Sequence, residues 1–168
     1  TDASPRRWRS ESLWLVAVLA LAALLRFWDL ANLPPGCIGG ECTAALRLLD
    51  PQPLATGATS AAQAALNLLA GLLARLGLPP LLSLRVAAGL VGWLTVGALW
   101  LGVRRLAPGA AGVLAAALLS ANPWHIWAGR TSDPWVVVTL FTTLVIWCGA
   151  EAIIGSSARM WVWAGAAF

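Results

Sequence analysis

Long apolar stretches without a charged side chain are the feature that most constrains this chain. Residues 86–103 contain no charge and would extend about 27 Å as an α-helix, roughly the thickness of the hydrocarbon core of a bilayer. The 168 residues are 60% hydrophobic and only 11% charged, whereas soluble domains contain about 25% charged residues. The sequence therefore predicts an integral membrane protein and excludes a soluble globular enzyme.

The distribution of basic residues agrees with this prediction. All 11 basic residues are arginines, and they are divided among short segments between the apolar stretches. Such spacing is typical of residues that orient helices in a bilayer, whereas a nucleic-acid surface needs a clustered basic face. We therefore expect the lipid bilayer as the surroundings of the chain, and we expect no nucleic-acid partner.

The apolar stretches predict an all-α, polytopic transmembrane helix bundle. Residues 1–12 are polar and basic, and we expect them to form a cytoplasmic N-terminus in the cytoplasmic (inner) membrane. No small-residue cleavage site follows the first apolar stretch, which predicts a retained span rather than a signal peptide. The membrane domain would then be residues 13–168. Four full spans and a partial fifth are predicted in it, at residues 13–25, 86–103, 110–128, 134–150 and 160–168.

The connection at residues 33–85 is predicted to lie on the outer side of the membrane. Within it, residues 61–76 have a helical pattern, with a narrow polar stripe that recurs every four residues. This pattern fits an interfacial helix and also a fifth full span, and the arginine count is the same for both topologies. The stripe consists of Gln63, Asn67, Gly71 and Arg75.

Small residues and the incomplete last span predict contacts with further helices. Gly89 and Gly92, together with abundant Ala, are typical of surfaces where transmembrane helices pack closely. We therefore expect these faces to contact either other transmembrane subunits or later spans of the same polypeptide. The tryptophans at the ends of the stretches, Trp28, Trp124, Trp127 and Trp135, are typical of an interfacial belt.

Several short motifs occur in a recognisable order along the chain. They are LRFWDL at 25–30, LPPG at 33–36, GECTAALRLL at 40–49, GLPP at 77–80, LRV at 84–86, RRL at 104–106 and ANPWHIWAGR at 121–130. In this order they resemble the N-terminal third of the polyprenyl-phosphate-dependent membrane glycosyltransferases, the GT-C superfamily that includes protein O-mannosyltransferases and aminoarabinose transferases. The resemblance implies helices along the membrane surface in the first outer loop, which favours the interfacial orientation of residues 61–76.

The resemblance also implies a reaction, the transfer of a sugar from a polyprenyl-phosphate carrier to an acceptor hydroxyl at the outer membrane face. Such chemistry needs a carboxylate beside the acceptor and cationic groups beside the departing phosphate. We expect Glu41 and Asp133 to be the catalytic carboxylates. Arg85, Arg130 and His125 are the expected substrate-binding residues. No zinc pattern occurs, and whether a divalent metal takes part stays open.

One departure from the family pattern leaves enzymatic activity open. Members usually carry an Asp-Glu pair in the first outer loop, with the Asp as the favoured base, and the aligned positions here are Gly40 and Glu41. Glycine supplies neither a base nor a metal ligand. The alternative is a shortened, non-catalytic accessory subunit of a larger membrane complex, such as a respiratory or photosynthetic assembly. The sequence does not identify the sugar or the acceptor.

The expected site residues also have alternative interpretations. Glu41 also fits a solvated or helix first-turn acid, and Asp133 fits a cap of the fourth span that pairs with Arg130. His125, the single histidine, also fits a haem or pigment ligand.

The three cysteines specify little. Cys37 and Cys42 share the predicted outer loop, where a disulfide is one alternative, and Cys148 lies within a predicted span as a small apolar residue.

Overall fold

The computed structural model describes residues 5–49, 60–107 and 110–155, and every regular element in this part is an α-helix. The predicted all-α fold class is therefore confirmed for these residues. The predicted partial fifth span, residues 160–168, lies outside the described residues. The helices are α1 (Pro5–Phe27), α2 (Glu41–Arg47), α3 (Ala61–Arg75), α4 (Pro80–Leu106), α5 (Ala111–Ala121), α6 (Pro123–Arg130) and α7 (Trp135–Gly155).

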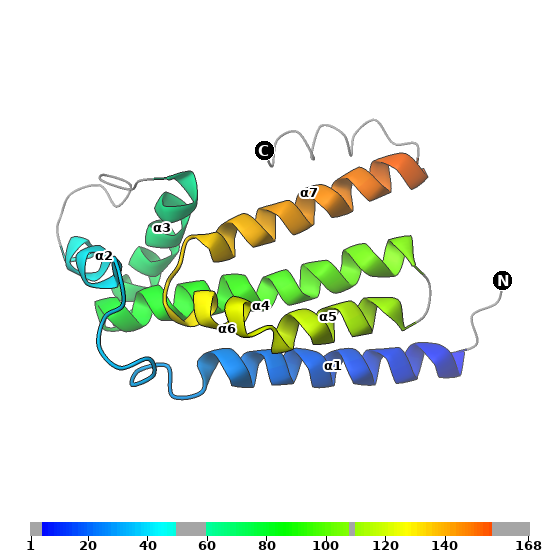
Figure 1. Cartoon of the computed structure of the whole chain (residues 1–168), viewed down its shortest axis with the longest axis horizontal. Helices are drawn as coiled ribbons and strands as arrows, with labels where there is room; N and C mark the ends of the chain where they lie inside the picture. Colours follow the sequence, from blue (N-terminus) through cyan, green and yellow to red (C-terminus); the bar gives the residue numbers. More distant parts are fainter. Residues whose placement is uncertain (1–4, 50–59, 108–109, 156–168) are drawn as a thin grey trace.

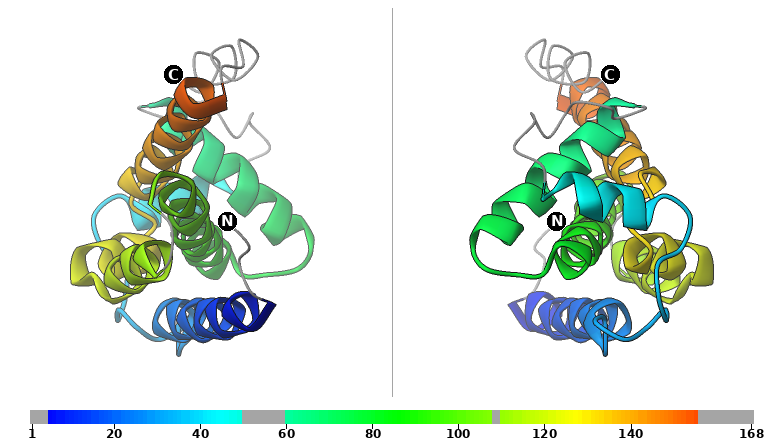
Figure 2. Two further views of the ribbon diagram at one scale, coloured as in Figure 1. Left: turned by 90° about the vertical axis from the view of Figure 1, so that its right-hand side faces the viewer. Right: turned by 90° about the vertical axis from the view of Figure 1, so that its left-hand side faces the viewer.

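Helix α4 is the centre of the bundle. It packs against each of the other described helices, and α1, α5 and α7 run alongside it (Figures 1 and 2). This position requires small side chains, because close approach of helix backbones leaves no room for large ones. The core on α4 accordingly includes Ala87, Ala88 and Gly89, with Leu84 and Val91 filling the wider gaps.

The connections between the long helices alternate between the two ends of the bundle. The start of α1, the end of α4, the start of α5 and the end of α7 share one end (Figure 1). The opposite end, which we call the loop end, holds residues 28–40, α2, α3, α6 and the start of α7. This alternation matches the predicted hairpin order, with the first connection and the 130–133 turn on the same side.

Two described helices, α4 and the Trp135–Ala152 part of α7, are long and apolar enough to cross a bilayer. Helix α1 begins at Pro5, within the predicted cytoplasmic segment, and includes charged residues in its first two turns. Helix α5 has only 11 residues. The number of spans and the cytoplasmic orientation of the N-terminus therefore stay predictions.

Helix α3 crosses the loop end of the bundle instead of running parallel to the spans. Figure 2 views α1, α4 and α5 nearly end on, whereas α3 is seen along its length. The middle of its predicted polar stripe faces the protein: Gln63 Nε2 donates to Asn67 Oδ1 at 2.8 Å, and Asn67 and Gly71 are buried, whereas Arg75 at the end of the stripe is exposed. Leu68 and Leu72 are exposed on its other side. The interfacial orientation of α3 stays a prediction.

The predicted third span, residues 110–128, is not one continuous helix. Pro123 ends α5, because a proline disfavours helical geometry at the preceding residue and donates no backbone hydrogen bond. Asn122 is extended, and its Oδ1 accepts the His125 N–H at 3.1 Å, which caps the start of α6. Asn-Pro is a common way to begin a helix, so the break was readable in the sequence.

The glycines expected to contact partner helices pack inside this chain instead. A Cβ on Gly89 would lie 2.8 Å from Phe27 Cε1, and a Cβ on Gly92 would lie 3.2 Å from both Arg26 Nε and Val136 Cγ2. The face of α4 at Gly89 is thus covered by α1, and the face at Gly92 is covered by α1 and α7. The prediction that these two glycines form a surface for other subunits is therefore wrong.

Replacing Gly92 with Leu should destabilise the bundle by at least about 1–3 kcal/mol, because the new side chain enters a filled space. Gly97→Leu is the matched control, since a Cβ at Gly97 meets no atom within 4 Å. Thermal unfolding of the detergent-solubilised protein measures the difference. Equal melting temperatures of the two variants would contradict the packing described for Gly92.

Candidate functional site

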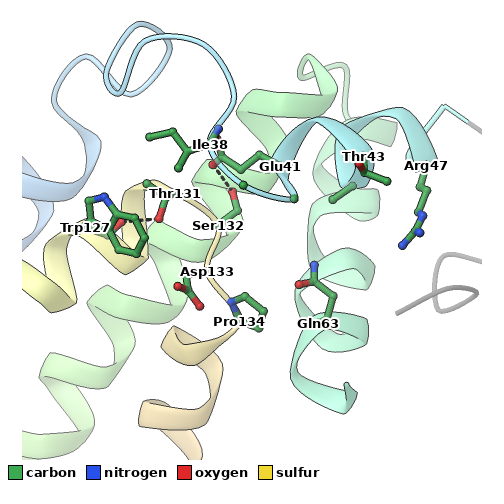
Figure 3. A pocket seen from close by; sticks show the side chains of 13 residues that line it. Ile38, Glu41, Thr43, Arg47, Gln63, Trp127, Thr131, Ser132, Asp133 and Pro134 are labelled. Atoms are coloured by element: carbon green, nitrogen blue, oxygen red, sulfur yellow. Dashed lines mark hydrogen bonds between the residues drawn. The ribbon is translucent and has the colours of Figure 1, made fainter. Parts of the chain in front are cut away.

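A cavity of about 410 Å³ opens at the loop end of the bundle. One wall is formed by residues 38–41 and the α2 helix, and the other by Trp127 of α6 and residues 131–134, with Gln63 of α3 between them (Figure 3). Glu41 and Asp133, the two expected catalytic residues, both line it. The structure thus brings together two residues that lie 92 positions apart in the sequence.

Glu41 is held in a dense set of internal bonds. Its Oε1 accepts the Ser132 Oγ–H at 3.1 Å, and its Oε2 accepts the Ile38 N–H at 3.1 Å. Oε2 also forms an ion pair with Arg85 Nη2 at 3.1 Å. Because Glu41 is only 3% exposed and both oxygens accept bonds from this chain, its carboxylate holds the cavity wall together.

Arg85 lies behind Glu41 and does not line the cavity. It is 1% exposed, and besides Glu41 it donates to the carbonyl oxygens of Leu30 and Gly36. The guanidinium therefore ties the loop after α1 to α4. Arg85 was expected to bind substrate, and the structure places it as the counter-charge of Glu41 instead.

Asp133 has a different environment from Glu41. Its Oδ1 accepts the Trp135 N–H at 3.0 Å, which confirms the predicted cap at the start of α7. The side chain is half-buried and borders the cavity, and it forms no ion pair with another described residue. Of the two expected carboxylates, Asp133 is the one with access to a ligand in the cavity.

Arg130 does not form the ion pair with Asp133 that the spacing suggested. Its Nη1 donates to the Leu25 carbonyl at 2.9 Å, and its Nη2 donates to the carbonyls of Trp28 and Leu33 at 2.9 and 3.0 Å. These bonds satisfy carbonyls where α1 ends. Arg130 borders a second cavity of about 310 Å³, which is on the other side of Trp127 and Thr131.

His125 lies inside the bundle, away from both cavities. Its Nδ1 accepts a hydrogen bond from Arg26 Nη2 at 2.8 Å, and Arg26 Nη1 donates to the Ala22 carbonyl at 3.1 Å. Arg26 is fully buried and His125 is 6% exposed. The pair links α1 to α6, so the placement of His125 is that of a structural partner of Arg26.

Several polar residues of the cavity were not expected from the sequence, among them Thr43, Arg47 and Gln63. Thr43 and Arg47 of α2 line it together with Gly40, at the i, i+3 and i+7 spacing of one helical face. Gln63 lines it from α3. The seven-residue α2 is too short for its apolar pattern to have identified this face in advance, although the spacing was present.

Gly40 has open space where a side chain would be. Its φ is −82°, which any residue adopts, and a Cβ there meets no atom within 4 Å. The position borders the cavity. A side chain at position 40 would therefore find open space at the cavity wall among the described residues.

The loop with Gly40 and Glu41 is closed by a disulfide between Cys37 and Cys42. Disulfides persist in oxidising compartments, which supports the predicted outer location of this loop. Cys148 is a free cysteine within α7. Among the described residues, no group of three His, Cys, Asp or Glu side chains is placed to hold a metal ion.

A helical membrane bundle with a charged cavity at one end defines the general class, and sequence comparison gives the family. Residues 64–168 match the family described as dolichyl-phosphate-mannose-protein mannosyltransferase. The chain belongs to this family of GT-C membrane glycosyltransferases, which confirms the predicted resemblance. No curated protein and no solved structure matches the chain. The matched residues include Asp133 and Arg85, whereas Gly40 and Glu41 precede them.

The Glu41–Arg85 pair yields a stability prediction. Arg85→Met should destabilise the protein by about 3–5 kcal/mol, because it leaves the Glu41 carboxylate buried without a counter-charge. Adding Glu41→Gln should recover a large part of this loss, since the double variant buries no charge at either position. Thermal unfolding of the two variants in detergent tests the coupling. A double variant no more stable than Arg85→Met would contradict it.

Proposed function

We propose that this chain forms the substrate cavity of a glycosyltransferase that moves a sugar from a polyprenyl-phosphate carrier to an acceptor hydroxyl. The observation that carries the proposal is the Asp133 carboxylate, which borders a cavity of about 410 Å³ in a member of this family. A carboxylate in this position can accept the proton of a hydroxyl, provided that the hydroxyl reaches hydrogen-bond distance.

The proposed step balances as a substitution at the anomeric carbon of the sugar. The acceptor oxygen forms a bond to that carbon, and the bond between the carbon and the carrier phosphate breaks. The proton of the acceptor hydroxyl passes to Asp133, and the electron pair of the broken bond leaves with the lipid phosphate. Glu41, paired with Arg85, shapes the wall of the cavity.

We also propose that the loop end of the bundle faces the outer side of the membrane. Residues 28–40, α2, α3, α6 and the start of α7 share this end (Figure 1), and the Cys37–Cys42 disulfide suits an oxidising compartment. In this orientation the N-terminus lies in the cytoplasm, and the lipid-linked sugar reaches the cavity from the outer leaflet of the cytoplasmic membrane.

Asp133→Asn tests the role of the carboxylate. Asn caps a helix about as well as Asp, so the variant should keep the bond to the Trp135 N–H and remove only the charge. We expect transfer of labelled mannose from polyprenyl-phosphate mannose to fall by a factor of roughly 100 or more. Serine- and threonine-bearing peptides and hydroxyl-bearing glycolipids serve as acceptors, in proteoliposomes.

Asp29→Asn is the matched control for that assay, because Asp29 is an exposed carboxylate at the same end that lines neither cavity. It removes the same charge and should leave transfer unchanged. Equal activity of wild type and Asp133→Asn, in an assay where the wild type transfers sugar, would rule out Asp133 as the base.

Gly40→Asp should raise sugar transfer above the wild-type rate, because it restores a second carboxylate at the cavity wall. The open space at Gly40 and its ordinary φ lead us to expect a melting temperature within a few degrees of wild type. Gly39→Asp is the contrasting variant for the melting temperature. Gly39 has a φ of 58°, which residues with a side chain rarely adopt, so this variant should be the less stable of the two. Unchanged or lower transfer by a stably folded Gly40→Asp protein would contradict the expectation.

A specific observation also favours the accessory-subunit alternative. The cavity lacks the first family carboxylate at Gly40, and the carboxylate beside it, Glu41, is saturated by internal bonds. A non-catalytic member would bind neither donor nor acceptor productively and would copurify with other membrane subunits. Absence of transfer by wild type and by Gly40→Asp, together with a stoichiometric partner in the native membrane, would establish this alternative.

A further inference from the structure

The second cavity, of about 310 Å³, has a lining that the proposed reaction does not use. It is lined by Trp28, Leu33, Pro34, Trp127, Arg130 and Thr131. Trp127 and Thr131 also line the first cavity, and Figure 3 shows them at the same side of it as Asp133. The two cavities are therefore neighbours that share a wall.

Bonds within the chain hold the second cavity in shape. Arg130 Nη2 donates to the carbonyls of Trp28 and Leu33 at 2.9 and 3.0 Å, which ties both residues to the end of α6. Thr131 donates from its N–H and from its Oγ1 to the Trp127 carbonyl, at 3.0 Å in both cases. A ligand therefore meets walls whose backbone is already ordered, which lowers the entropic cost of binding.

Two tryptophans give this cavity an aromatic lining. The Trp127 ring stacks on the Trp124 ring, with the ring centroids 5.3 Å apart and an angle of 25° between the planes. Because Trp124 covers one face of this indole, Trp127 borders the cavities with its other face or its edge. Trp28 is 67% exposed and lines the second cavity as well.

Arg130 adds hydrogen-bonding capacity to the aromatic lining. A guanidinium has five N–H groups, and the bonds to the carbonyls of Leu25, Trp28 and Leu33 use three of them. Arg130 is half-buried and borders the cavity, so its remaining N–H groups can donate to oxygen atoms of a ligand. Its charge disfavours a cationic occupant such as a choline headgroup, which tryptophans alone would attract.

We propose that the second cavity binds one pyranose ring of a saccharide acceptor. A pyranose has an apolar face of C–H groups, which suits the indoles of Trp28 and Trp127, and a rim of hydroxyl groups, which suits Arg130. A volume of about 310 Å³ is at the lower end of the range of small-molecule sites, as a single ring requires. The next ring of the acceptor then extends past Trp127 into the first cavity, where its hydroxyl meets Asp133.

The role of this ring as part of an acceptor rests on the proposed function. The inference adds the acceptor class to that function, a glycan or glycolipid rather than the serine or threonine of a sugar-free peptide. It differs from membrane anchoring by an interfacial belt, which would treat exposed tryptophans of the loop end alike. Trp28 and Trp135 are both 67% exposed at this end, but Trp135 lines neither cavity.

Saturation-transfer NMR of the full chain with methyl α-mannopyranoside and methyl α-glucopyranoside tests the site without requiring catalysis. The detergent is an amine oxide, because a detergent with a sugar headgroup would compete. Trp28→Leu keeps an apolar side chain and removes the indole, so we expect the dissociation constant of the bound pyranoside to rise roughly three- to tenfold. Trp28→Phe should keep part of the affinity.

Trp135→Leu is the matched control and should bind like wild type. Melting temperatures check that the variants are folded. Should Trp28→Leu fail to fold, Trp28→Phe and Trp135→Phe carry the same comparison, with a smaller loss of affinity expected in the first and none in the second.

The outcomes separate this inference from the proposed function. Weaker pyranoside binding in the Trp28 variant, with unchanged binding in the Trp135 variant, supports the site even where no sugar transfer is measured. Equal affinity of wild type and the Trp28 variant, an equal loss in both variants, or no binding of either pyranoside to wild type overturns it, even where Asp133→Asn abolishes transfer. A sugar-free peptide with serine and threonine that displaces the pyranoside from wild type would overturn the saccharide as the occupant.

Discussion

The buried ion pair between Glu41 and Arg85 is the interaction on which the loop end of the molecule depends. Removing two charges from water is costly, and the cost is offset only where further hydrogen bonds satisfy both groups. Here the bonds come from Ile38, Ser132, Leu30 and Gly36, in segments far apart in the sequence. The pair therefore fixes the loop after α1, the start of α2 and the turn before α7 on one residue of α4.

Arg26 and Arg130 also hold the backbone at this end of the bundle. Helix ends leave carbonyl oxygens without intrahelical partners, and in a membrane few water molecules are present to satisfy them. Arg26 and Arg130 donate to carbonyls of α1 or of the residues just after it. An arginine near an apolar stretch thus has two competing explanations, substrate recognition and satisfaction of the backbone, which the sequence alone does not separate.

The helices were largely predictable because apolar stretches of sufficient length must form them, and the polar stripe of residues 61–76 indicated α3 before its contacts were known. The proline at position 123 indicates the break, but the long apolar stretch around it predicts one continuous span. The common cavity of Glu41 and Asp133 followed from the family resemblance. Arg47 did not follow, because the face of a seven-residue helix is set by tertiary packing rather than by its own periodicity.

The two walls of the cavity are held in place by different parts of the chain. Asp133 directly precedes a 21-residue helix that packs against α4, and its carboxylate is oriented by the Trp135 N–H in the first turn of that helix. Gly40 belongs to a loop closed by a disulfide, whose position depends on the Glu41–Arg85 pair. A glycine at position 40 is compatible with this pair, because Glu41 makes its bonds independently of the side chain before it. In the mechanism we propose, the chain therefore retains the shape of the cavity and transfers the proton on the wall that the bundle itself supports.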